Sequence, residues 1–237
     1  MSGHSKWSTI KHKKALTDAK KGKIFSKLAN VISVASRNGA DSTMNPNLRL
    51  AIEKAKKAEM PAINIQRAID RGSGKNGVID IQEETYEAYG PGGVGLIIEI
   101  ISDNPVRTIA EIRAVLNRNN SKLAENGAVS FQFERVGQII IGKNDFSDDI
   151  ELKIIDYGAE DILEKNNEII INSKVEDFNK IIKLIEEENI EIIDSAIIYK
   201  PKNSIKIDEN KLEKLKKLID DLENIDDISN IYYNFEF

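Results

Sequence analysis

Apolar residues in the first 75 positions recur at helical spacing in three short stretches. After Thr17, which can cap a helix, the apolar face of the first stretch consists of Ile24, Leu28, Ile32 and Ala35. Gly39 lies just beyond the end of that stretch. Asn45-Pro46 predicts the start of a second helix, and Pro61 predicts the start of a third that ends at Gly72. The pattern therefore indicates a compact domain of three short helices, followed by a Gly/Ser-rich linker.

From Glu84 onward the apolar pattern is that of β-strands. Two strands flank Gly90–Gly93 and predict a hairpin, and 102–105 precedes a helix that it can cap. Residues 128–133 then predict a further strand. The stretch 138–199 predicts the order βαββαβ, which is typical of a ferredoxin-like unit. One more helix over 210–222 and a strand over 228–237 complete the chain.

The ββαβ segment before this unit lacks one helix and one strand, which the C-terminal segment can supply. The sequence thus predicts an α+β fold of three domains: an N-terminal three-helix domain and two ferredoxin-like α/β domains, the third inserted into the second. The expected boundaries are 1–77 for a basic helical domain with a mobile N-terminal arm, 78–136 with 201–237 for the discontinuous middle domain, and 137–200 for the inserted domain.

Composition excludes several classes of protein. The 237 residues contain no cysteine, which excludes disulfides, thiolate nucleophiles and zinc fingers. Apolar runs are only five or six residues long, and the N-terminus has no apolar segment after its first lysine. We therefore expect a cytoplasmic protein with no membrane partner.

Two glycine-rich motifs suggest nucleotide binding but lack the required context. Gly90–Gly95 fits GxGxxG, yet a strand rather than a helix is predicted to follow it. Gly72–Asn76 resembles the end of a P-loop, but a helix precedes it and Asn76 stands where a hydroxyl is needed. The two histidines, His4 and His12, have no carboxylate or cysteine neighbours that would complete a metal site. We expect no cofactor, no metal, no catalytic residues and no enzymatic activity.

Charge is strongly divided along the chain. The first 75 residues contain 16 Lys and Arg and 5 Asp and Glu, a net charge of +11, whereas the remainder carries 18 and 34, a net charge of −16. A basic segment of this kind favours a polyanionic partner such as nucleic acid. The candidate contact residues in it are Lys6, Trp7, Lys11, His12, Lys13, Lys14, Lys20, Lys21, Lys23 and Lys27.

Aromatic residues leave two interpretations open. Trp7 can stack on an unpaired base or pack against the helical domain. The alternating pairs Phe131/Phe133 and Tyr233/Phe235, with Phe237, resemble the base-stacking strands of RNA-recognition modules. The same alternation is required of any strand that covers a core, and the acidic surroundings favour the core.

Several blocks resemble the YebC family. They are Gly3–Trp7, Ile10–His12, Asp18–Lys20, Lys23–Leu28, Asn45-Pro46 with Leu48-Arg49, Met60-Pro61, Ile65–Ile69, Tyr86-Glu87, Tyr89–Gly93, Asp103-Asn104 with Arg107-Thr108, and Gly127 with Val129. The resemblance is dense over 1–135 and continues as domain order to the C-terminus. Arg49, Arg67 and Arg107, which lie in these blocks, join the candidate contact residues.

This resemblance implies a three-domain, non-enzymatic protein that acts on gene expression. Members of the family include DNA-binding transcriptional regulators and ribosome-associated translational activators. The expected partner is therefore nucleic acid, either DNA or ribosomal RNA, with the ribosome as a further partner in the second case. An enzyme with an unrecognised site is the remaining alternative.

Overall fold

The computed structural model describes residues 18–75 and 81–235, and side chains from Lys21 onward. The described chain divides into two compact units. Unit 1 contains the described residues up to Ser130 together with those from Ser204, and unit 2 is Phe131–Asn203. No helix in these ranges is both long and apolar enough to cross a membrane.

Within the described residues, the N-terminal part of unit 1 contains the three helices that the sequence predicts: α2 (Asp18–Ser36), α3 (Pro46–Lys57) and α4 (Ala62–Gly72). Its core combines large and small side chains: Leu28, Ile32, Leu48, Ala51, Ala55, Met60, Ile65, Ala68 and Ile69. The Asn45 side chain caps α3 by accepting a hydrogen bond from the backbone N–H of Leu48. Because a Cβ at Gly72 would lie 1.9 Å from the carbonyl oxygen of Ser33, only glycine permits the close approach of α4 to α2.

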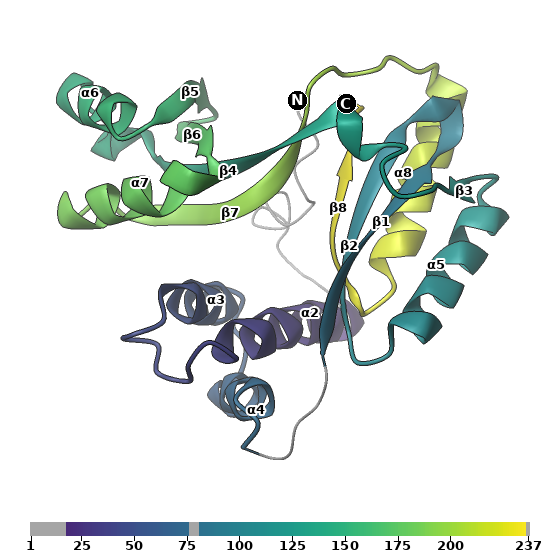
Figure 1. Ribbon diagram of the computed structural model, residues 1–237, viewed down its shortest axis with the longest axis horizontal. Coiled ribbons are helices and arrows are strands. Elements are labelled where there is room, and N and C mark those ends of the chain that lie inside the picture. The colour runs from purple at the N-terminus through teal and green to yellow at the C-terminus, as the bar shows by residue number, and fades with distance from the viewer. Residues whose placement is uncertain (1–17, 76–80, 236–237) are drawn as a thin grey trace. The chain divides into compact units, whose positions relative to one another are not determined.

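The rest of unit 1 is a four-stranded antiparallel sheet with two helices on one face (Figure 1). Its strands are β1 (Gln82–Tyr89), β2 (Gly95–Ser102), β3 (Lys122–Leu123) and β8 (Ile228–Tyr233), in the order β3-β1-β2-β8. The helices are α5 (Pro105–Arg118) and α8 (Glu209–Glu223), whose Ile112, Leu116, Leu215 and Leu222 pack with Leu96, Ile98 and Ile100 of β2.

The path of the chain through this sheet explains the domain insertion. β1 and β2 form a hairpin across the 3₁₀ turn η1 (Pro91–Gly93), so a strand follows the glycine motif, and Gly92 has φ 78°. A ferredoxin-like chain normally places a helix and a strand between its two central strands. Here that helix and strand are α8 and β8, which come from the C-terminal end, as the sequence predicts.

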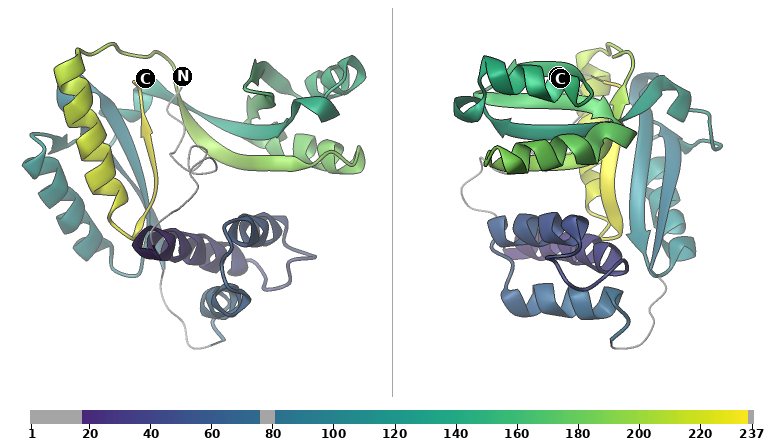
Figure 2. Two further views of the ribbon diagram at one scale, coloured as in Figure 1. Left: turned by 180° about the vertical axis from the view of Figure 1, so that it is seen from behind. Right: turned by 60° about the vertical axis from the view of Figure 1, so that its left-hand side comes forward.

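Unit 2 is a complete βαββαβ unit (Figure 2). Its elements are β4 (Phe133–Gly142), the turn η3 (Lys143–Asp145), α6 (Asp148–Asp156), β5 (Ala159–Lys165), β6 (Glu168–Lys174), α7 (Val175–Glu187) and β7 (Ile192–Pro201). The strand order β5-β6-β4-β7 is that of a ferredoxin-like sheet. The missing side chain at Gly137 leaves room for Phe178 of α7, since a Cβ there would lie 2.6 Å from it. The predicted α+β class with two ferredoxin-like sheets is confirmed.

The strand predicted over 128–133 is wrong. Residues Ser130–Gln132 form the 3₁₀ turn η2, and the edge strand of the first sheet is the two-residue β3. The reason is the buried carboxylate of Glu87, which accepts hydrogen bonds from the backbone N–H groups of Gly127, Val129 and Ser130. These backbone N–H groups are therefore unavailable for hydrogen bonds to a neighbouring strand.

The aromatic residues of the two alternating pairs differ in their burial. Phe133, Tyr233 and Phe235 are buried, which confirms the core interpretation for them, and Phe237 lies outside the described residues. Phe131 is the exception, because 65% of its surface is exposed.

Candidate nucleic-acid interface

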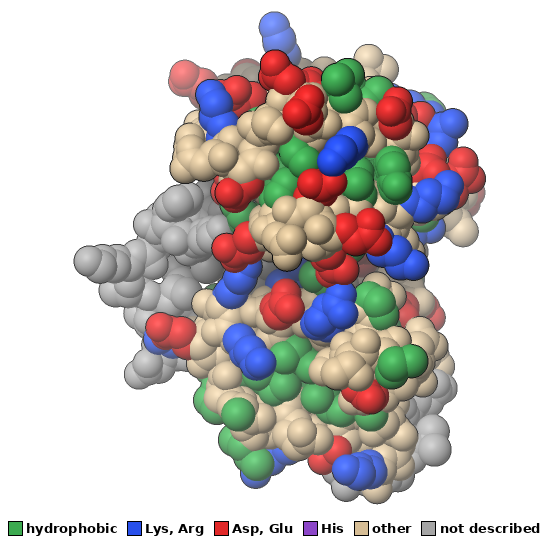
Figure 3. Space-filling model, turned by 90° about the vertical axis from the view of Figure 1, so that its left-hand side faces the viewer, with side chains coloured by type: hydrophobic (Ala, Val, Ile, Leu, Met, Phe, Trp, Pro, Cys, Tyr) green, Lys and Arg blue, Asp and Glu red, His purple; other side chains and the backbone are tan. Residues whose placement is uncertain are grey.

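The described part of the helical domain keeps the positive charge that the sequence indicates. Residues 21–75 contain 11 Lys and Arg and 4 Asp and Glu, a net charge of +7. Unit 2, residues 131–203, contains 9 and 17, a net charge of −8. Figure 3 shows that both acidic and basic side chains are exposed on the face that it draws.

Several of the predicted contact residues cannot be placed. Lys6, Trp7, Lys11, His12, Lys13 and Lys14 lie outside the described residues, as does the side chain of Lys20. The predicted mobile arm therefore stays a prediction.

The predicted contact residues of α2 are partly engaged in the fold. Lys21 pairs with Glu59 at 3.4 Å, and the Nζ of Lys23 donates to the Oδ1 of Asn224 at 2.7 Å. Lys27 is half-buried. A side chain held in this way has less freedom to follow a phosphate backbone than an unpaired lysine on the surface.

The other helices carry more accessible basic groups. Arg67 on α4 is exposed and, within the described part of the chain, its side chain forms no ion pair or hydrogen bond, whereas Arg49 on α3 is half-buried. The last turn of α3 adds Lys54, Lys56 and Lys57. Their positive charges also stabilise the helix, because its C-terminal end carries a partial negative charge. These lysines contribute to the net charge of the segment but are not among the contact residues predicted from the sequence. The run Lys-Ala-Lys-Lys at the end of a predicted helix was the signal available.

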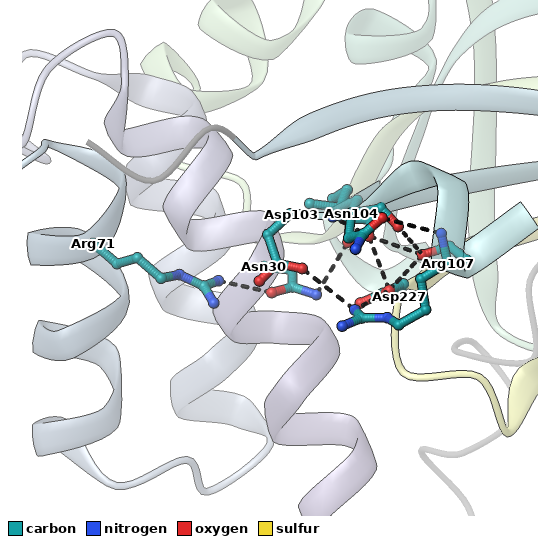
Figure 4. Close-up of polar contacts among 9 residues, drawn as sticks. Asn30, Arg71, Asp103, Asn104, Arg107 and Asp227 are labelled. Carbon is teal, nitrogen blue, oxygen red and sulfur yellow. Dashed lines mark hydrogen bonds and ion pairs between the residues drawn. The ribbon is translucent and has the colours of Figure 1, made fainter. Parts of the chain in front are cut away.

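Another basic side chain, Arg71, positions Asn30, which contacts the first sheet (Figure 4). The Nη2 of Arg71 donates to the Oδ1 of Asn30 at 2.7 Å, and the Nδ2 of Asn30 donates to the carbonyl oxygen of Ile101 at 3.3 Å. The Nε of Arg71 also donates to the Oγ of Ser33 at 2.9 Å. Burial lowers the pKa of Arg71, an effect partly opposed by the negative charge of Asp103. Arg71 therefore has a structural role.

Arg107, the candidate from the sheet domain, belongs to a cluster around Asp227 (Figure 4). The Oδ2 of Asp227 accepts hydrogen bonds from Thr108 Oγ1 at 2.6 Å, Ser102 Oγ at 2.9 Å and Arg107 Nη2 at 3.0 Å. Burial raises the pKa of Asp227, but these hydrogen bonds outweigh it and the net pKa lies below the usual value. Because Arg107 also pairs with Asp103 at 3.3 Å, its guanidinium is occupied by the fold.

The motif residues of the sheet domain are thus explained by structure. Asn104 caps α5 by accepting a hydrogen bond from the backbone N–H of Arg107. For Glu87, burial raises the pKa, yet its backbone hydrogen bonds make the net pKa lower than usual. In the ranges that the structure describes, no group of three or more His, Cys, Asp or Glu side chains is placed to hold a metal ion.

Comparison with known proteins gives a consistent picture. Residues 5–75 match the model for the TACO1/YebC protein N-terminal domain, and residues 81–235 match the model for the TACO1/YebC second and third domain. The chain is 46% identical over 241 residues to a probable transcriptional regulatory protein of Halothermothrix orenii, covering 100% of this chain and 95% of that protein. It is 43% identical over 239 residues to one of Caldanaerobacter subterraneus, covering 100% and 98%.

A solved structure shares the fold as well. The crystal structure of a conserved hypothetical protein from Aquifex aeolicus matches with a TM-score of 0.83 and 40% identity, over 98% of this chain and 97% of that one. The family matches together span both units, and the relatives correspond over nearly their full length. The chain therefore belongs to the TACO1/YebC family.

Proposed function

We propose that this protein is a non-enzymatic, cytoplasmic regulator of gene expression that binds nucleic acid through its helical domain, residues 1–77. The observation that carries the proposal is the division of charge. A net charge of +7 on the described helical domain contrasts with −8 on unit 2. The names of the relatives, probable transcriptional regulatory proteins, support DNA as the nucleic acid.

Electrostatics explains how the charge division acts. Phosphates attract Lys and Arg side chains irrespective of sequence, and the counterions released from DNA contribute much of the affinity. The acidic sheet domains repel the same phosphates, so that the helical domain is the part that approaches. Exposed Lys56 and Arg67, together with the lysines of residues 1–20, are the proposed contacts.

The proposal is tested by the salt dependence of binding to duplex DNA, measured by fluorescence anisotropy. Replacing Lys56 and Arg67 with alanine should lower the slope of log affinity against log salt by about 1.8, because each lost phosphate contact contributes about 0.9. Lys183→Ala with Lys214→Ala is the matched control, since it removes two exposed lysines outside the helical domain.

A further triple variant, with Lys11, Lys13 and Lys14 replaced by alanine, tests the segment that precedes α2. For this variant, the slope of log affinity against log salt should fall by the amount expected for the loss of about 2 to 3 phosphate contacts. If the control pair lowers the slope as much as the Lys56/Arg67 pair, the contacts do not lie in the helical domain. If structured ribosomal RNA outcompetes duplex DNA at equal salt, the family's translational role replaces the transcriptional one.

A further inference from the structure

Phe131 is an aromatic side chain that the fold holds in solvent. Its neighbours at the same spacing, Val129 and Phe133, are buried, whereas 65% of Phe131 is exposed. The surrounding backbone is well fixed, because Lys202 donates its Nζ to the carbonyl oxygen of Phe131 at 3.0 Å and its backbone N–H to that of Gln132 at 2.9 Å. The exposure of the ring is therefore a feature of ordered structure.

The residues near Phe131 in unit 2 have a net positive charge, opposite in sign to that of the unit as a whole. Residues 131–135 and 199–203 contain three basic residues and one acidic residue, Glu134, although unit 2 as a whole carries −8. Lys200 pairs with Asp161, which leaves exposed Arg135 and Lys202 as the cations of this region.

Arg135 adds a second flat group. It lies opposite Tyr199 in the β4–β7 ladder, and its guanidinium carbon is 5.6 Å from the centre of the tyrosine ring. A guanidinium over an aromatic ring is attracted to the electron-rich face of that ring, which restrains the side chain. Its outer face can receive another planar group, such as a nucleotide base.

From these observations we infer a second nucleic-acid contact in unit 2, formed by Phe131, Arg135 and Lys202, that binds unpaired nucleotides of a single strand. One base stacks on Phe131, a second lies on the Arg135 guanidinium, and the ammonium of Lys202 is attracted to the phosphates. The bases of a duplex are already stacked on each other, so a duplex cannot use this contact in the same way. The inference rests on the proposed function and adds single-stranded nucleic acid as the ligand of a separate surface.

The chemistry of the region favours nucleic acid over a protein partner. A stable protein interface buries about 800 Å² on each side and has an apolar centre. Here the exposed apolar group is one ring with cations beside it, which is the combination of stacking surface and positive charge found in proteins that bind single strands.

The test uses the full chain with a labelled oligouridine and a DNA duplex of the same length. Phe131→Ala should weaken oligouridine binding about 5- to 150-fold, the loss expected for one stacked base, and change duplex binding less than about twofold. Phe131→Tyr, which keeps a stacking ring, should restore oligouridine binding. Val106→Ala removes another exposed apolar side chain, 78% exposed on α5, and should have no effect.

Ultraviolet crosslinking locates the contact independently. Uridine should crosslink to the peptide that contains Phe131, and the crosslink should disappear in Phe131→Ala. If the wild-type chain binds duplex DNA but Phe131→Ala leaves oligouridine binding unchanged, the inference is overturned and the proposed function stands. Equal losses for both ligands, or no recovery in Phe131→Tyr, also overturn the inference. If the wild-type chain binds neither ligand, the proposed function fails with it.

Discussion

The cluster around Asp227 provides a sharp test of what holds the sheet domain together. One carboxylate oxygen of Asp227 accepts hydrogen bonds from Thr108, Ser102 and Arg107, which links the α8–β8 connection to the start of α5. Asp227→Asn keeps the size of the side chain and removes its charge. The variant therefore isolates the contribution of the ionised form.

The magnitude follows from the three hydrogen bonds. Those from Thr108 and Ser102 lie in a largely buried site, and loss of the charge should weaken each by about 1 kcal/mol. Arg107 is 52% exposed, so solvent screens its ion pair and we assign it no part of the loss. We expect Asp227→Asn to lower the free energy of unfolding by about 2 kcal/mol at neutral pH. At about 2–4 °C per kcal/mol, the melting temperature should fall by about 4–8 °C.

The assay is urea unfolding followed by circular dichroism between neutral pH and pH 3. Because the pKa of folded Asp227 lies below its unfolded value, its stabilising effect is complete above that unfolded value, about 3.9. The effect is lost as the pH falls through the folded pKa. The difference between wild type and variant should therefore be constant from pH 7 to about pH 5 and decrease below about pH 4.

The matched control is Asp226→Asn, which removes the same charge from an exposed neighbouring residue. A loss of stability in Asp227→Asn no larger than in this control would contradict the assigned hydrogen bonds. A difference that does not decrease in acid would show that the ionised carboxylate is not responsible.

Four other substitutions test separate parts of the fold. Glu87→Gln should lower the free energy of unfolding by about 1–3 kcal/mol and speed hydrogen exchange in the loop that its carboxylate holds, as nuclear magnetic resonance would show. Gly72→Ala should cost about 1–3 kcal/mol or more in thermal unfolding because its Cβ meets the backbone of Ser33, whereas Gly22→Ala, with open space around it on α2, should stabilise by about 1 kcal/mol. Asn45→Ala should cost about 1–2 kcal/mol in urea unfolding, since the cap of α3 is lost.

Local signals made much of the fold predictable. Asn45 and Asn104 each precede a proline and cap the helix that follows, so these helix starts could be read from adjacent residues. The strand predicted over 128–133 failed because Glu87, some 40 residues earlier, takes the backbone donors of that segment. An apolar pattern carries no information about such a distant acceptor.

The net positive charge of the candidate interface could be predicted from the sequence, whereas the individual residues available to a ligand could not. The excess of lysine and arginine in the helical domain is a property of composition. The exposure of Arg67 and the partial burial of Arg71, four residues later, depend on how α4 packs against α2. Similarly, the carboxylate that binds Arg107 lies 120 residues away in the chain. Only the folded structure separates the basic groups available to a ligand from those that hold the protein together.

The insertion of unit 2 into the first sheet imposes an order on folding during synthesis. β2 is complete at Ser102, but its partner β8 begins at Ile228. At about 5–20 residues per second, a ribosome needs about 6–25 s to make the intervening chain. During this interval unit 2 can fold, while one edge of β2 has no partner and the apolar residues that α8 covers are exposed. The segment that contains α8 and β8 thus completes the first sheet only after unit 2 has been made, and loss of β8 would damage a domain whose first strand begins at Gln82.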